Sequence, residues 1–173
     1  MPIYALGDLV PDIHPDAYIH PDAVIIGQVS IGAGSSIWAH TVIRADDAPI
    51  TIGERTSIQD GSVLHTTPPT PTTVGNRCVV GHMVHLEGCL IEDGALVGSG
   101  SIVLHAAVVG SGALVGANAV VTNGMKVPPG TMALGVPAKI RPGPDDQPAF
   151  IKMNAANYVE RGQWYRKDLR RLD

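Results

Sequence analysis

Aliphatic side chains recur at every sixth position along most of this chain. Neither an α-helix, with about 3.6 residues per turn, nor a strand, with a period of two, produces this spacing. Short strands joined by tight turns do produce it when each aliphatic side chain points into a shared core. The pattern therefore predicts an all-β solenoid, a parallel β-helix of hexapeptide repeats. The series is Ile13, Ile19, Ile25, Ile31, Ile37 and Ile43; Ile52, Ile58 and Leu64; Val74, Val80 and Leu86; and Ile91, Val97, Val103, Val109, Val115, Val121 and Val127.

Three hexapeptides make one coil of the solenoid. Residues three hexapeptides apart are therefore neighbours along the solenoid axis, in strands about 4.8 Å apart. Two interruptions shift the count: DAP (47–49) adds three residues, and TTPPTPTT (66–73) adds four. Counting with both interruptions places three outward-facing residues, Arg44, His65 and Glu87, in one vertical file. A histidine, a carboxylate and a guanidinium are thus predicted to share one outer wall of the solenoid.

The stretch GHMVHLEGC, at 81–89, contains two further histidines. His82 lies near a corner on the preceding face, and Asp60 occupies the equivalent place one coil below. The intervening backbone makes it hard for His82 to reach the file of its own chain. If a neighbouring copy packs its Asp60/His82 corner against the file, three ligands could converge on one metal. Side-chain alternation is expected to direct His85 away from Glu87.

Beyond about residue 140 the six-residue series stops. We therefore divide the chain into a β-helix at 1–140 and, at 141–173, a linker and a C-terminal helix packed on the same domain. The segment AFIKMNAANYVERGQWYRKDLRRL has apolar residues at spacings near three, four and seven, which predicts an amphipathic helix with Gly162 as a candidate break. Its apolar residues are Phe150, Met153, Tyr158, Tyr165, Leu169 and Leu172.

Composition narrows the function classes. The chain of 173 residues is 45% hydrophobic but only 4% aromatic, so small aliphatic residues must fill its core. A net charge of -4 argues against a nucleic-acid partner, and no apolar stretch is long enough for a membrane span. The start of the chain lacks the pattern of a signal peptide, and Cys78 and Cys89 are too few for a disulfide framework. A cytoplasmic protein acting on a small molecule is expected.

The chain resembles the gamma-class carbonic anhydrases over residues 1 to about 165. This resemblance implies a left-handed parallel β-helix with a C-terminal helix, assembled as a homotrimer with metal sites between subunits. It also implies reversible hydration of carbon dioxide by a metal-bound hydroxide at the trimer interface. The motifs that carry the resemblance are VIRAD (42–46), SIQDGSVLH (57–65), VGHMVHLEGC (80–89) and GVPAK (135–139), followed by the terminal helix.

The resemblance also assigns roles to individual residues. His65 and, from the adjacent subunit, His82 match zinc ligands, and Gln59 matches a residue that orients the metal-bound water. The remaining matches are Arg44 and Asp46, a pair that bridges subunits, Asp60, the usual partner of that pair, and Tyr158, which matches a tyrosine near the pocket.

Glu87 stands where the family has its third metal-binding histidine, and this departure permits three interpretations. Glu87 is itself a ligand, which gives two histidines, one carboxylate and an open position, a recognised catalytic zinc pattern. Alternatively, His85 replaces the missing ligand, or the metal is weakened or lost. We adopt the first, in which Glu87 is both a ligand and a catalytic residue. A carboxylate ligand would make the bound water less acidic and hydration slower at neutral pH, and it makes iron an alternative to zinc.

Other functions remain open from the sequence. The same solenoid serves coenzyme A-dependent acyltransferases, so a hexapeptide-repeat acyltransferase or acyl-CoA thioesterase is one alternative, with no dependence on metal. A non-catalytic trimeric protein that binds a metal or a siderophore is the other. The loop TTPPTPTT contains no carboxylate to export protons, and Asp47 is the candidate proton relay, although an exposed turn aspartate has the same pattern.

Overall fold

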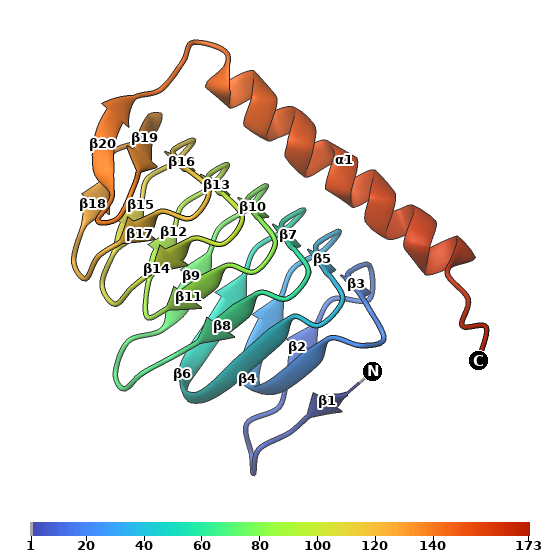
Figure 1. Ribbon diagram of the computed structural model, residues 1–173. Coiled ribbons are helices and arrows are strands. Elements are labelled where there is room, and N and C mark those ends of the chain that lie inside the picture. Colours follow the sequence, from blue (N-terminus) through green and yellow to red (C-terminus); the bar gives the residue numbers. More distant parts are fainter. Residues whose placement is uncertain (1) are drawn as a thin grey trace.

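The computed structural model describes residues 2–173 and shows a β-solenoid of about seven turns with one helix along its side (Figure 1). The strands pair in parallel from coil to coil, and they form one 12-stranded and one 8-stranded sheet. The 12-stranded sheet bends around a corner, because the long strands β4 and β6 continue from one wall into the next. The predicted all-β parallel solenoid is thereby confirmed.

The two sheets divide the strands as follows. The 12-stranded sheet contains β1 (Ile3–Tyr4), β2 (Asp12–Ile13), β4 (Val24–Ile31), β6 (Val42–Ile52), β8 (Val63–His65), β9 (Thr72–Val74), β11 (His85–Glu87), β12 (Leu90–Ile91), β14 (Ile102–Val103), β15 (Val108–Val109), β17 (Val120–Val121) and β18 (Lys126–Val127). The 8-stranded sheet contains β3 (Tyr18–Ile19), β5 (Ser36–Ile37), β7 (Ser57–Ile58), β10 (Val79–Val80), β13 (Leu96–Val97), β16 (Leu114–Val115), β19 (Thr131–Leu134) and β20 (Lys139–Pro142), which pairs antiparallel with β19.

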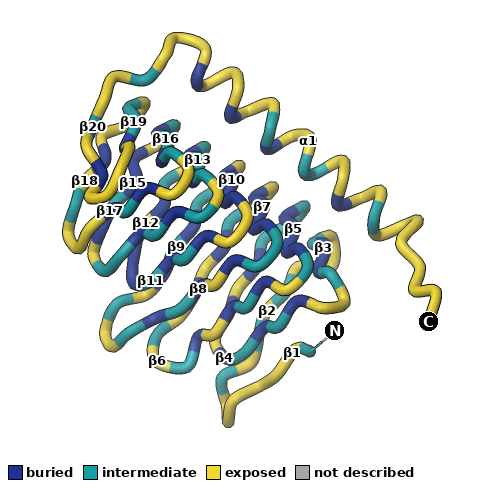
Figure 2. Tube along the Cα trace, in the orientation of Figure 1, coloured by how far each residue is buried: buried dark blue, intermediate teal, exposed yellow. Residues whose placement is uncertain are grey.

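The six-residue series lines the interior of the solenoid. From Ile25 to Val127, every member of the series is at most 3% exposed, and Figure 2 shows buried segments recurring along the coils. Each such aliphatic side chain stabilises the fold by about 1.5–3 kcal/mol relative to an exposed one. Stacked rows of Ile, Val and Leu therefore form one continuous core along the axis.

Both interruptions of the series change the register as the sequence predicts. In β6 the three extra residues form a bulge, because Gly27 of β4 lies opposite Ala45 whereas Val29 lies opposite Ile50. The four extra residues form a loop between β8 and β9, where Thr67 and Thr70 make an isolated bridge. Beyond each interruption the inward aliphatic residues stack again.

The C-terminal helix α1 (Gln147–Asp168) packs against β3, β5, β7 and β10. It is continuous, so the candidate break at Gly162 does not occur. A Cβ atom at Gly162 would lie 3.3 Å from Cβ of Tyr18, which indicates that the missing side chain permits close approach to β3. Of the residues that the structure describes, none forms a helix long and apolar enough to cross a membrane.

The face of α1 that contacts the solenoid differs from the predicted one. Its fully buried members are Ile151, Ala155 and Gly162 together with Gln147, whereas Phe150 and Met153 are about half exposed. Figure 2 shows the same alternation of buried and exposed positions along the helix. Small side chains at the contact bring the helix near the turns of the coils, and the larger apolar residues are left outside.

Candidate metal centre

Arg44, His65 and Glu87 form the vertical file that the spacing predicts. Arg44 of β6 lies opposite His65 of β8, and His65 lies opposite Glu87 of β11. Leu64 and Leu86, which precede the last two, are fully buried. Because alternate residues of a strand face opposite sides, the file faces outward from the wall.

The His65 imidazole is held by Arg44 at both ring nitrogens. A guanidinium nitrogen of Arg44 lies 3.0 Å from Nε2, and the Arg44 carbonyl oxygen lies 3.0 Å from Nδ1. A carbonyl can only accept and a guanidinium can only donate, so Nδ1 carries the proton and the Nε2 lone pair accepts the hydrogen bond from Arg44. The same tautomer would bind a metal at Nε2 if the Arg44 guanidinium moved away.

Two neighbouring carboxylates accompany His65 at the bulge of β6. Asp46 forms an ion pair with Arg44, and its Oδ1 lies 3.7 Å from Nδ1 of His65. Asp46, Asp47 and His65 each place one potential ligand atom within 4.8 Å of the other two. The three extra residues of the bulge bring both acids to this edge. From the sequence, Asp47 was a candidate proton relay or an exposed turn residue, and its adjacency to Asp46 was the available signal for a closer role.

Glu87 is held by three side chains. The Thr67 hydroxyl donates to Oε1 at 2.6 Å, Nε2 of His85 lies 3.0 Å from Oε2, and Nε2 of His105 lies 3.4 Å from Oε1. The hydrogen bond from Thr67 is the largest of the effects that lower the pKa of Glu87 to about 2, and the hydrogen bond from His85 adds to it. Glu87 is therefore a carboxylate at neutral pH.

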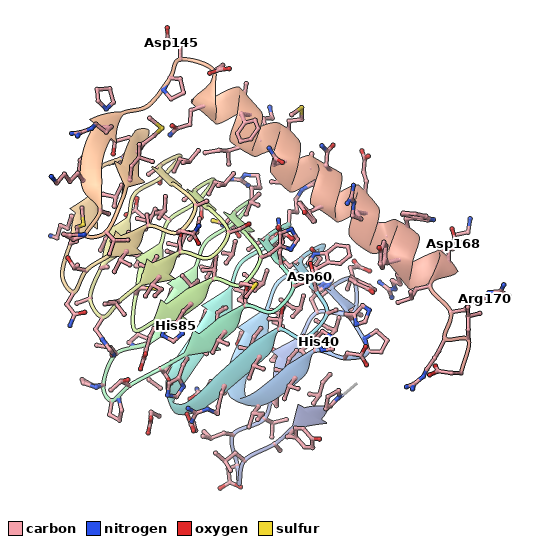
Figure 3. The ribbon with its side chains drawn as sticks, in the orientation of Figure 1. His40, Asp60, His85, Asp145, Asp168 and Arg170 are labelled. Carbon is pink, nitrogen blue, oxygen red and sulfur yellow. The ribbon has the colours of Figure 1, made fainter. Side chains whose placement is uncertain are left out.

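His85 points toward Glu87, so the expectation that it turns away is wrong. Both residues flank the buried Leu86 in β11, and residues two apart on a strand share a face. The side chains consequently lie side by side on the outer wall, where Figure 3 marks His85. The sequence already contained this information, because the alternation rule applied correctly places positions 85 and 87 together.

Thr67 and His105 complete this cluster, although neither was predicted from the sequence as a site residue. Nε2 of His105 lies 3.2 Å from the Thr67 hydroxyl. His105 follows β14, the strand one coil beyond β11. The register pairs Leu86 with Val103, so Leu104 and not His105 stacks on Glu87, and the repeat alone does not bring His105 to the site. Thr67 has no signal in the sequence either, because it belongs to the inserted loop and its side chain follows no hexapeptide register.

Thr67→Val is expected to raise the pKa of Glu87 toward the ordinary glutamate value, because it removes the largest of the stabilising hydrogen bonds. A lowered pKa in the folded state contributes stability above the unfolded pKa, and this contribution is lost as the pH falls through the folded pKa. In the metal-free wild type, stability associated with Glu87 should therefore fall between about pH 4.5 and about pH 2. The variant should show a smaller decrease. Titration of the Glu87 carboxyl by NMR measures the pKa directly, and an unchanged value would contradict the assignment.

His82 and Asp60 meet at a corner of the same chain. Nδ1 of His82 lies 2.9 Å from a carboxylate oxygen of Asp60, and both side chains are about half exposed. The carboxylate accepts a hydrogen bond from Nδ1–H of His82, so Nε2 carries the lone pair. Figure 3 shows Asp60 nearer to α1 than His85 is. Among residues 2–173, the group of three potential ligands found on this chain includes neither His82 nor Glu87.

Gln59 and Tyr158 belong to this corner and not to the file. Gln59 directly follows β7 and is 4% exposed. Its backbone carbonyl accepts a hydrogen bond from the Thr41 hydroxyl. Tyr158 of α1 packs edge-on against Trp38. Burial is the main cause that raises the pKa of Tyr158, and the negative charge of Asp60 contributes further. One chain therefore presents a corner with Gln59, Asp60, His82 and Tyr158, and a neighbouring wall with His65 and Glu87.

His65, His82 and Glu87 carry donor groups that suit a divalent metal. Both His65 and His82 use Nδ1 to bond an oxygen acceptor, the arrangement that commonly fixes the tautomer of a metal-binding histidine. Glu87 adds an anionic oxygen. Two imidazoles and one carboxylate form a recognised set for zinc or for non-haem iron.

The coils and the histidine-rich wall together define a hexapeptide-repeat β-helix with a candidate metal centre. The family model for bacterial transferase hexapeptide (six repeats) matches residues 11–45 and 88–123. A carbonic anhydrase from Geobacillus kaustophilus is 42% identical over 165 residues, which cover 95% of this chain and 91% of that protein. The chain belongs to the gamma-class carbonic anhydrase family of hexapeptide-repeat proteins.

Two further relatives support this assignment. The mitochondrial gamma carbonic anhydrase 1 of Arabidopsis thaliana is 36% identical over 163 residues, which cover 90% of this chain and 59% of that protein. A crystal structure from Bacillus cereus, named as a candidate acetyltransferase, has a TM-score of 0.93 and 41% identity, and the match covers 94% of this chain and 95% of that one. The family shares one fold under names that denote different reactions.

Proposed function

We propose that this chain is a gamma-carbonic-anhydrase-like metalloenzyme that hydrates carbon dioxide reversibly. It acts as a homotrimer, in which His65 and Glu87 of one subunit and His82 of the partner subunit hold a zinc ion, with iron as the alternative. One observation carries the proposal: the wall and the corner of the chain each present a histidine with a tautomer suited to metal, yet they point from different faces.

The residues of the chain have separate tasks in this proposal. Asp60 fixes the tautomer of His82, and the Arg44 carbonyl fixes that of His65. Thr67 and His85 keep Glu87 anionic and oriented. The metal supplies a Lewis acid that activates water for attack on carbon dioxide.

Gln59, Tyr158 and the ion pair of Arg44 and Asp46 are proposed to position the reactants and the subunits. The Gln59 amide, which offers both a donor and an acceptor, orients the attacking water. Tyr158 closes the corner beside Asp60. Arg44 and Asp46 form an ion pair at the edge of the wall, where Asp60 of the partner subunit would join them. Bicarbonate is the product that the site releases.

A second candidate is acyl transfer or acyl-CoA hydrolysis. It is favoured by the Bacillus cereus structure, which shares 41% identity with this chain and bears an acetyltransferase name. Acyl transfer by a histidine base would not require the metal. Assays with acetyl-CoA before and after chelation therefore separate the two functions.

Mixed trimers test the shared site. His65→Ala and His82→Ala are each expected to lose most of the bound metal, because each removes one of three ligands. Trimers that combine the two variants at equal amounts should recover about one quarter of the sites, since one interface in four then joins an intact wall to an intact corner. Metal content by elemental analysis and carbon dioxide hydration by stopped flow measure the recovery.

A matched control is His14→Ala, which removes an exposed histidine of the first coil that contacts neither the wall nor the corner. It should retain full metal content. If the mixed trimers recover no metal, or if each single variant binds metal fully, the intersubunit site is wrong.

A further inference from the structure

A cavity of about 460 Å³ lies between α1 and the turns of the coils, and none of the candidate metal-centre residues lines it. Its volume falls within the range of about 300–1,000 Å³ that is usual for small-molecule sites. Apart from Lys152, the residues that α1 contributes to the lining are apolar, and they include the buried Ile151 and Ala155. This cavity takes no part in the function proposed above.

The cavity originates in one corner of the solenoid, where turn residues with positive φ stack from coil to coil. Successive coils connect there through backbone hydrogen bonds, for example from Gly94 to Asn76 and from Gly112 to Asp93. A Cβ atom at Gly94 or Gly112 would meet nothing within 4 Å. The missing side chains leave a hollow that α1 covers. The stacked residues are Gly34, Arg55, Arg77, Gly94, Gly112 and Gly130.

Two arginines interrupt this column of glycines. Arg55 and Arg77 adopt φ values of 55° and 54°, a region that favours glycine, although four other coils have glycine at this place. Both guanidinium-bearing residues line the cavity, and Lys152 of α1 adds a third cation. Arginine thus replaces glycine at two coils of the column, and both arginines place positive charge beside the hollow.

The positive charge of the cavity is only partly neutralised. Asp93 is the acidic residue of the lining; it lies 3.5 Å from Arg77 and is hydrogen-bonded by the backbone and side chain of Asn76. Within residues 2–173, Arg55 and Lys152 form no ion pair. The lining therefore has an excess of two positive charges next to an apolar wall.

We propose that this cavity binds a small organic anion with an apolar body, either a carboxylate or a phosphate ester. Arginine presents a planar fork of donors that matches the oxygens of both groups. Arg55 and Arg77 hold the anionic head, and Lys152 adds charge at the rim. The apolar body lies along Ile151 and Ala155, above the two glycines of the column.

Calorimetric titration of the full chain with four probes tests the proposal. Octanoate and octyl phosphate combine an anionic head with an apolar body, whereas octan-1-ol lacks the charge and inorganic phosphate lacks the body. At least one of the two amphipathic anions should bind with a dissociation constant at least about tenfold lower than both octanol and phosphate. The stronger of the two identifies the head group.

Two variants locate the binding at this cavity. The double variant Arg55→Gly and Arg77→Gly removes both cations and places glycine where the neighbouring coils already have it, so folding should be retained. Ala156→Trp fills the cavity from the exposed side of α1 without changing the charge. Each should weaken binding of the amphipathic anion by at least about tenfold. Arg166→Gln, which removes a cation of α1 outside this cavity, is the matched control and should leave binding unchanged.

Three results would overturn the proposal. Octanol binding as tightly as the anions would show that the cavity selects no charge. Unchanged affinity in the double glycine variant and in Ala156→Trp would place the binding elsewhere. Absence of binding by both amphipathic anions at millimolar concentration would show that the cavity is no site for this class of ligand. None of these results depends on metal or on carbon dioxide hydration.

Discussion

Glu87→His is expected to increase the rate of carbon dioxide hydration at pH 7 by about tenfold. If Glu87 holds the metal as proposed, the substitution would replace an anionic ligand with a neutral imidazole, and a bound metal would then retain more positive charge and make a bound water more acidic. A decrease of about one unit in the pKa of that water gives about tenfold more of its reactive form at neutral pH. The pH profile of the rate should shift in the acidic direction. Stopped-flow assays at several pH values, on protein of measured metal content, check both effects.

Glu87→Gln is the matched control for this substitution. It preserves the shape of the side chain but removes its negative charge, and it should lower metal content while the fold is retained. The idea that Glu87 is a ligand is contradicted if Glu87→Gln keeps full metal occupancy. If neither the wild type nor Glu87→His binds metal, the proposed reaction itself fails.

Gly27→Ala is expected to destabilise the protein by about 2–5 kcal/mol. Gly27 has a φ of +82°, where a side chain costs about 1–2 kcal/mol. A Cβ atom there would also lie 2.9 Å from the carbonyl carbon of Ala45, and such overpacking costs about 1–3 kcal/mol more. Because Ala45 lies between Arg44 and Asp46, the strain should also displace the residues that hold His65. Urea unfolding measures the stability, and metal content measures the effect on the site.

Gly94→Ala separates the two causes. Gly94 has a similar φ of +66°, yet a Cβ atom there meets nothing within 4 Å. It should cost only the conformational term of about 1–2 kcal/mol and leave the metal content unchanged. Equal losses in the two variants would show that contact between β4 and β6 does not limit what position 27 accepts.

The fold could be predicted from the sequence because every hexapeptide of the solenoid buries one aliphatic side chain in the same way. An aliphatic residue every six positions leaves one arrangement that buries all of them, and a shifted register would expose whole rows of Ile and Val. The counts through both interruptions predicted that Arg44, His65 and Glu87 stack, and the strand pairing confirms it. The packing face of α1 was harder to predict, because the helix packs through small residues whose contribution is the space they leave.

Among the residues around Glu87, one could be placed from the sequence and another could not. The place of His85 follows from strand alternation, and only a misapplied rule directed it away. The hydrogen bond from Thr67 could not be predicted, because Thr67 lies in an inserted loop outside the hexapeptide register. Its hydroxyl contacts Glu87, which is 20 residues away in the sequence. That contact is the largest of the effects that lower the pKa of Glu87. The sequence alone shows a carboxylate in place of a histidine, but the contact shows that this carboxylate is kept charged.

The solenoid, the stacking of its outward residues and the family resemblance follow from the sequence, because periodic burial acts on residues a constant distance apart. Which atoms of those residues face one another depends on the tertiary structure. It joined Glu87 to Thr67 and His105, and it placed two arginines of the turn column beneath α1, next to a hollow that glycines leave open. Such contacts arise between an inserted loop, a helix and the coils, whose mutual positions depend on packing and not on any period.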